Sequence, residues 1–151
     1  MKMYFIFGGM ISFVIFGNLG IHYYYKNKHK DLIKSLKGKN YKLISKVNMT
    51  MESSAKIAFS YQRNKADVIF LDDEIFLLLF SKPFPQAQPI LQISNSDKSF
   101  SNISKKISFN SKFNVRGKLR IKGNYGQGIT SGNYTIFLDI KGKDFDTNSI
   151  L

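Results

Sequence analysis

The pattern of hydrophobic and polar positions changes sharply along this chain. Residues 3–25 form one apolar run without an acidic or basic side chain, and three tyrosines end it. As a helix rising about 1.5 Å per residue, the run would be roughly 34 Å long, enough to cross a hydrocarbon core of about 30 Å. Large residues at its end disfavour cleavage as a signal peptide, and apolar residues all round disfavour a soluble core helix. We therefore expect a transmembrane anchor over residues 1–25.

After residue 40 the apolar positions recur with a period of two, which is typical of strands with one buried face. The alternating segments are residues 43–51, 57–61, 90–94 and 134–140. Residues 67–80 contain two apolar runs around an acidic triplet, which predicts a hairpin with a solvated turn, since the ligand spacing of a calcium loop is missing. We expect residues 41–151 to form a mainly β, antiparallel domain. The pattern leaves open a small sandwich or a partly open barrel.

The segment 66–93 carries a family resemblance. It reads Ala66-Asp-Val-Ile-Phe-Leu-Asp-Asp-Glu-Ile-Phe-Leu-Leu-Leu-Phe80 and then Gln88-Pro-Ile-Leu-Gln-Ile93. It resembles the central hairpin and the following strand of bacterial PH-like and GRAM-like domains. The resemblance implies a small curved β domain that binds lipids or proteins, with no catalytic residues to carry over.

Residues 109–122 show the most regular alternation in the domain. The odd positions are mostly apolar, and the even positions include Arg116, Lys118, Arg120 and Lys122. A strand of this pattern has one apolar and one cationic face. Gly117 could bend or bulge the strand, and a turn over residues 115–118 would convert it into a hairpin.

The net charge of +13 is concentrated next to the apolar run, where residues 26–46 hold eight lysines and one acid, Asp31. We interpret residues 26–40 as a basic juxtamembrane stalk. The positive-inside rule predicts a single-pass protein of the cell membrane, with the N-terminus outside and the β domain in the cytoplasm. Lys26, Lys28, Lys30 and Lys34 would then lie close to anionic headgroups, each attracted by about 1 kcal/mol. If the charge rule were overridden, the domain would lie outside.

The inventory of reactive side chains disfavours an enzyme. The chain has no Cys, and its two histidines, His22 and His29, lie at the end of the apolar run. Thiolate chemistry, a Ser-His-Asp arrangement and a multi-histidine metal site therefore have no basis in the β domain. The glycine-rich loop 123–132 lacks the phosphate-binding pattern and precedes a strand. We expect no cofactor and no metal.

Two functional hypotheses follow. The first is a non-enzymatic cytoplasmic β domain, tethered to the membrane, that binds anionic lipid or another membrane protein through the juxtamembrane lysines and the cationic strand. The alternative is a structural or assembly subunit of a membrane or envelope complex. Nucleic acid is an unlikely partner because few aromatic residues are interleaved with the lysines. The abundance of Lys, Asn, Ile and Phe is typical of an AT-rich bacterial gene.

Overall fold

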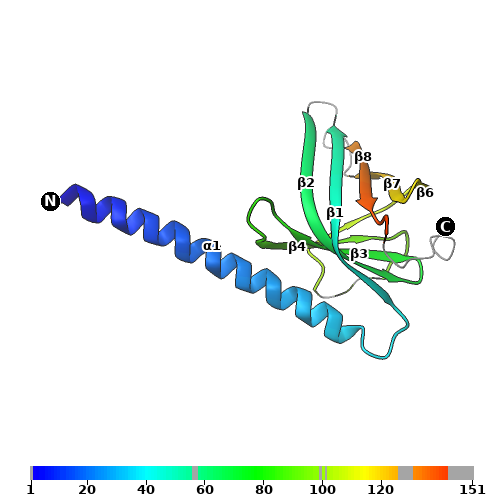
Figure 1. Ribbon diagram of the computed structural model, residues 1–151, viewed down its shortest axis with the longest axis horizontal. Coiled ribbons are helices and arrows are strands. Elements are labelled where there is room, and N and C mark those ends of the chain that lie inside the picture. Colours follow the sequence, from blue (N-terminus) through cyan, green and yellow to red (C-terminus); the bar gives the residue numbers. More distant parts are fainter. Residues whose placement is uncertain (1, 56–57, 99, 101, 126–130, 143–151) are drawn as a thin grey trace.

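The computed structural model describes residues 2–55, 58–98, 100, 102–125 and 131–142, with the side chains of 2–6, 55 and 58–61 excepted. These residues form one long helix and eight strands (Figure 1). The elements are α1 (Lys2–Ser35), β1 (Lys42–Ala55), β2 (Ala58–Leu71), β3 (Glu74–Phe80), β4 (Ala87–Ile93), β5 (Lys105–Ile107), β6 (Ser111–Val115), β7 (Lys118–Tyr125) and β8 (Gly132–Asp139).

All strands belong to one sheet in the order β5-β4-β3-β2-β1-β8-β7-β6, antiparallel except between β4 and β5. The sheet curls on itself, so the segment after β5 meets β7 and β8. Tyr134 on β8 donates its hydroxyl hydrogen to Ser108 O at 2.5 Å, and the Asn110 amide donates to Lys122 O at 2.8 Å. The expectation of a mainly β domain is confirmed. The sequence left open a sandwich or a partly open barrel, and the structure is a curled, half-barrel sheet.

Both predicted turns are present. The hairpin over residues 67–80 is formed by β2 and β3, and its turn includes Asp72 at φ 47°. Residues 115–118 join β6 to β7, with Arg116 at φ 53° and Gly117 at φ 80°. Two successive positive φ values are typical of a two-residue hairpin turn whose twist matches that of the flanking strands. Glycine adopts this conformation without steric cost.

Apolar side chains form two clusters, one on each face of the sheet. The inner cluster fills much of the barrel interior with residues from seven strands, including Val47, Val68, Leu77, Leu119 and Ile136. The outer cluster joins Leu32 of α1, and Leu36 directly after the helix, to β2, β3 and β4. Since β3 is covered on both faces, Glu74 to Leu78 are all buried. This explains its continuous apolar sequence, which a strand with one solvated face would not have.

Polar contacts also hold α1 against β4 and the preceding loop. His29 donates from Nε2 to Gln88 O at 2.8 Å, and the Ala87 amide donates to His22 Nδ1 at 3.0 Å. The His29 ring also packs edge-on against Phe80. The predicted stalk is thus helical as far as Ser35, and much of it is packed on the sheet.

In the part of the chain that the structure describes, no helix combines the length and the hydropathy that crossing a membrane requires. The expected transmembrane anchor over residues 1–25 is therefore not confirmed, although the helix itself is. Four glycines, Ser12 and Asn18 dilute the apolar run.

Gly123 gives the first test of the closure of the sheet. A Cβ atom there would overlap Ser108 O and would lie 2.5 Å from the Tyr134 hydroxyl. We expect Gly123→Ala to lower the free energy of unfolding by about 1–3 kcal/mol because the overpacked backbone must shift. Denaturant titration measures the loss. Gly20→Ala, where nothing lies within 4 Å, is the control and should not lower the midpoint. Equal midpoints would show that β7 and Ser108 are not in close contact.

His29 gives a test of helix docking. Burial lowers the pKa of His29 from its ordinary value of 6.5, and the Gln88 hydrogen bond and Asp67 oppose this only in part. The unfolded chain therefore binds the proton more tightly than the folded chain does. The contribution of neutral His29 is present above about pH 6.5 and is lost as the pH falls toward the folded-state pKa. We expect the unfolding temperature to fall more between pH 7 and pH 5 in the natural chain than in His29→Gln. Parallel pH profiles would contradict this burial.

Candidate functional site

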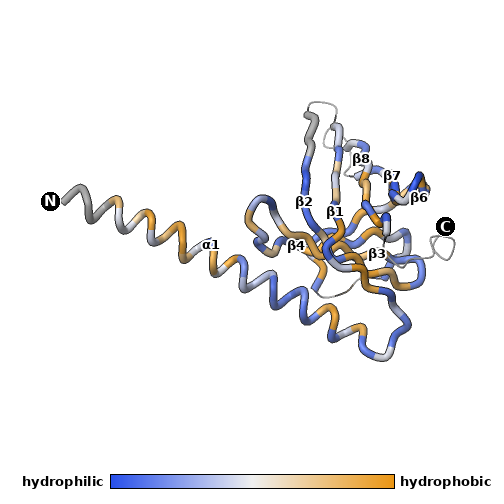
Figure 2. Tube along the Cα trace, in the orientation of Figure 1, coloured by the Kyte–Doolittle hydropathy of each residue, from blue (hydrophilic) through white to orange (hydrophobic). Residues whose placement is uncertain are grey.

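Large apolar side chains project on every side of α1 between Phe7 and Ile21, a stretch that we call the apolar half of the helix. Phe13 is 80% exposed and Phe16 is 72% exposed. Residues 13–16 are all apolar, and because successive helical positions are 100° apart, they point in all directions around the axis. This half extends away from the β domain as a largely hydrophobic rod (Figures 1 and 2). Soluble monomers rarely expose a continuous apolar surface of this kind, and large exposed apolar patches are typical of interaction sites.

The loop between β3 and β4 adds an exposed aromatic ring beside this rod. Phe84 is 80% exposed and stands between Pro83 and Pro85. The same loop is tied to the helix, because Gln86 donates from Nε2 to Asn18 O at 3.1 Å. Phe84 therefore belongs to the part of the β domain that is nearest to the apolar half of α1.

The four predicted lysines of the helix divide into two groups. Lys26, Lys30 and Lys34 are exposed, and their spacing of four residues places them in one row along α1. Lys28 is partly buried instead, with Nζ 3.4 Å from Asn102 Oδ1 and 5.8 Å from the centre of the Tyr24 ring. The row of three, which we call the helix lysine row, starts where the apolar half ends.

The second predicted set lies on the β6–β7 hairpin. Phe113 pairs with Arg120, and Val115 pairs with Lys118. Residues directly opposite in an antiparallel pair share a face, so exposed Phe113 and Val115 lie among the basic side chains. Of the two possibilities for residues 109–122, one continuous strand with an apolar and a cationic face or a hairpin with a turn at 115–118, the structure has the hairpin. The two-residue turn reverses the chain, so odd positions of β6 face the same side as even positions of β7.

The side chain of Arg120 packs against an aromatic ring on this face. Its guanidinium lies 5.3 Å from the centre of the Phe137 ring, and its buried Nε has no hydrogen-bond partner among the described residues. Arg120 and Lys122 line a cleft of about 370 Å³ together with Ser111, Asn133 and Thr135. Arg116 is in the turn and exposed. We call Phe113, Val115, Lys118, Arg120 and Lys122 the hairpin face.

The helix lysine row and the hairpin face do not form one surface. Figure 1, drawn with the longest axis horizontal, shows the β6–β7 hairpin at the opposite end of the molecule from the apolar half of α1. The structure thus separates two basic sets that the sequence could not place relative to one another.

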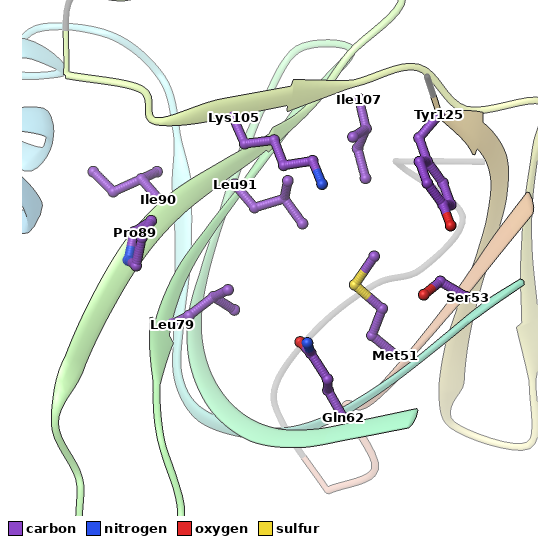
Figure 3. Close-up of a pocket in the computed structure, with 10 residues that line it drawn as sticks. All are labelled: Met51, Ser53, Gln62, Leu79, Pro89, Ile90, Leu91, Lys105, Ile107 and Tyr125. Atoms are coloured by element: carbon purple, nitrogen blue, oxygen red, sulfur yellow. The ribbon is translucent and has the colours of Figure 1, made fainter. Parts of the chain in front are cut away.

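The half-barrel also contains a cavity of about 330 Å³ on its inner side (Figure 3). Its walls are mainly apolar, and its polar side chains come from Ser53, Gln62, Lys105 and Tyr125. Lys105 extends toward Tyr125, with Nζ 5.6 Å from the centre of the ring (Figure 3). Lys105 of β5 and Tyr125 of β7 thus lie close together where the curled sheet is open.

The structure gives both histidines a packing role, since His22 and His29 bond to the backbone of residues 87 and 88. Within the described ranges, no group of three or more His, Cys, Asp or Glu residues could hold a metal ion.

Sequence analysis missed Phe84 and the cavity. A phenylalanine between two prolines was a usable signal for Phe84, because an isolated aromatic residue in a loop has no strand partner. The cavity had no such signal, because its residues come from six strands and only the register brings them together.

Comparison of the chain with protein-family models, with curated proteins and with solved structures finds no significant match. The resemblance of residues 66–93 to PH-like and GRAM-like domains stays a prediction.

Proposed function

We propose that this is a non-enzymatic membrane-associated protein that inserts the apolar half of α1 into a lipid bilayer and holds a binding β domain at the membrane surface. The observation that carries the proposal is the exposure of apolar side chains around the whole helix between Phe7 and Ile21. Apart from Ser12 and Asn18, this stretch has no polar side chain to turn toward water, so burial in a bilayer would be favourable. An amphipathic helix lying on the surface would have two distinct faces.

The residues directly after the apolar half are suited to the boundary of a membrane. His22, Tyr23 and Tyr24 come directly after the apolar half, and amphipathic rings favour the headgroup layer. Phe84 lies in the loop tied to Asn18 and would enter the same layer from the β domain. The helix lysine row comes next, where it would meet anionic headgroups. The excess of lysine after the apolar half of α1 favours the cytoplasmic side for the β domain.

The hairpin face is better placed for a protein partner than for the same membrane. It lies at the far end of the molecule from the inserted half of α1 (Figure 1). Its exposed Phe113 and Val115 lie beside stacked Arg120, and aromatic residues with arginine are enriched at protein interfaces. This observation favours a membrane-protein or envelope partner bound at the hairpin face, and with it the alternative role as an assembly subunit.

Insertion can be followed with single tryptophans because the chain has none. We expect the emission of Phe13→Trp to shift to the blue in vesicles and to be quenched by lipids with brominated chains. Phe84→Trp should be quenched by bromine near the headgroups, and Phe113→Trp should stay in water. An unquenched Phe13→Trp, or a Phe113→Trp that is quenched as strongly, would contradict the proposal.

Charge substitutions distinguish the two basic sets. At low salt, changing Lys26, Lys30 and Lys34 together to Gln should weaken binding of the full chain to anionic vesicles by up to about 100-fold, at about 1 kcal/mol per lysine. The matched control is the change of Lys118, Arg120 and Lys122 to Gln, which removes the same charge and should alter binding by less than about twofold. Co-sedimentation at increasing salt measures both, and the difference should shrink as screening increases. Equal losses would place the hairpin face on the membrane.

A further inference from the structure

The interior of the half-barrel is packed along only part of its length. Along β1, the inward positions begin with Val47 and Met49, which are buried, and continue with half-buried Met51 and Ser53. Along β7, Leu119 and Ile121 are buried, and Tyr125 is only half-buried. The core therefore gives way to the cavity of about 330 Å³ toward this end of both strands. A barrel of about eight strands is wide enough either to be filled by side chains or to hold one small ligand.

The walls of the cavity are suited to a hydrocarbon chain. Met51, Leu79, Leu91 and Ile107 reach it from β1, β3, β4 and β5, and Figure 3 shows their side chains arranged around the open space. Burying a methylene against such walls is favourable, and a cavity near the small end of the usual range for ligands fits one chain better than two.

One cation stands at the edge of these walls. Lys105 lines the cavity beside Leu91 and lies over the Tyr125 ring, and no lining residue is acidic. Among the described residues its ammonium group has no carboxylate partner. Its neighbour Lys106 points to the other face of the sheet, where Nζ donates to Ser96 O and to Lys98 O. Of the two adjacent lysines, only Lys105 is available to an anion in the cavity.

We propose that the half-barrel binds a single-chain amphiphile with an anionic head, such as a fatty acid or a lysophospholipid. The hydrocarbon chain lies along Leu91, Leu79 and Met51, and the anionic head pairs with Lys105 next to Tyr125. This site does not require insertion of α1, so binding of the amphiphile and insertion can succeed or fail separately.

Photolabelling of the full chain in nanodiscs of uncharged phosphatidylcholine tests the site. In one arm a diazirine analogue of lauric acid is added, and in a second arm a diazirine lysophosphatidylglycerol is added. We expect labelled peptides that contain Met51, Leu79 or Leu91 in at least one arm, and the stronger arm identifies the source of the ligand. Labels confined to α1 in both arms would refute the cavity site while supporting insertion. Labels in the cavity and none on α1 would support the cavity site and refute insertion.

Variants of the two lysines test the role of the charge. Lys105→Met should weaken competition by unlabelled laurate by about tenfold, the scale of one hydrogen bond to a charged group, and should leave competition by dodecanol unchanged. Lys106→Met is the matched control and should change neither competitor. For the natural chain, each added methylene from octanoate to laurate should strengthen competition by about fourfold. Equal effects of the two lysine variants, or no dependence on chain length, would overturn the proposal.

Discussion

The arrangement of the whole molecule depends on the packing of the second half of α1 against the outer face of β2, β3 and β4. Leu32 and Leu36, the residue directly after the helix, are fully buried there, and His29 adds a hydrogen bond to the backbone of β4 at Gln88. Truncating a buried leucine to alanine typically costs about 2–5 kcal/mol, so these contacts are large compared with the polar ones beside them. Without this packing, the apolar sequences of β3 and β4 would face water on one side.

The same packing fixes the orientation of the β domain relative to the apolar half of α1. Because one continuous helix contains both the exposed apolar half and the docked half, the β domain is held in a defined position relative to the apolar half. Phe84 and the helix lysine row then lie near the start of the docked half, and the hairpin face lies at the far end (Figure 1). Under the proposed function, two basic regions with similar composition would meet different partners, lipid headgroups for one and a protein for the other.

The sequence predicted local structure well wherever one physical rule dominated. The acidic triplet between two apolar runs predicted the β2–β3 turn, and Gly117 marked the β6–β7 turn, because both signals are local. The alternation over residues 109–122 left open a single strand or a hairpin, and the turn at residues 115–118 decides on which side Phe113 lies. The helix was predicted, but its docking was not. Nothing in residues 26–36 shows that Leu32 and His29 will meet strands from residues 69–90, because that contact is set by tertiary packing.

The most direct test of the central claim is a nitroxide scan along α1 in liposomes, which is practical because the chain has no native cysteine. Single cysteines from residue 10 to residue 36 would be spin-labelled, and collision with oxygen and with a water-soluble nickel chelate would be measured at each position. The account predicts high oxygen and low nickel accessibility up to about residue 16. At positions 29, 32 and 36 both should be low, with nickel accessibility returning at residues 26, 30 and 34. High nickel accessibility from residue 10 to residue 16, or uniform exposure of residues 29–36, would contradict it.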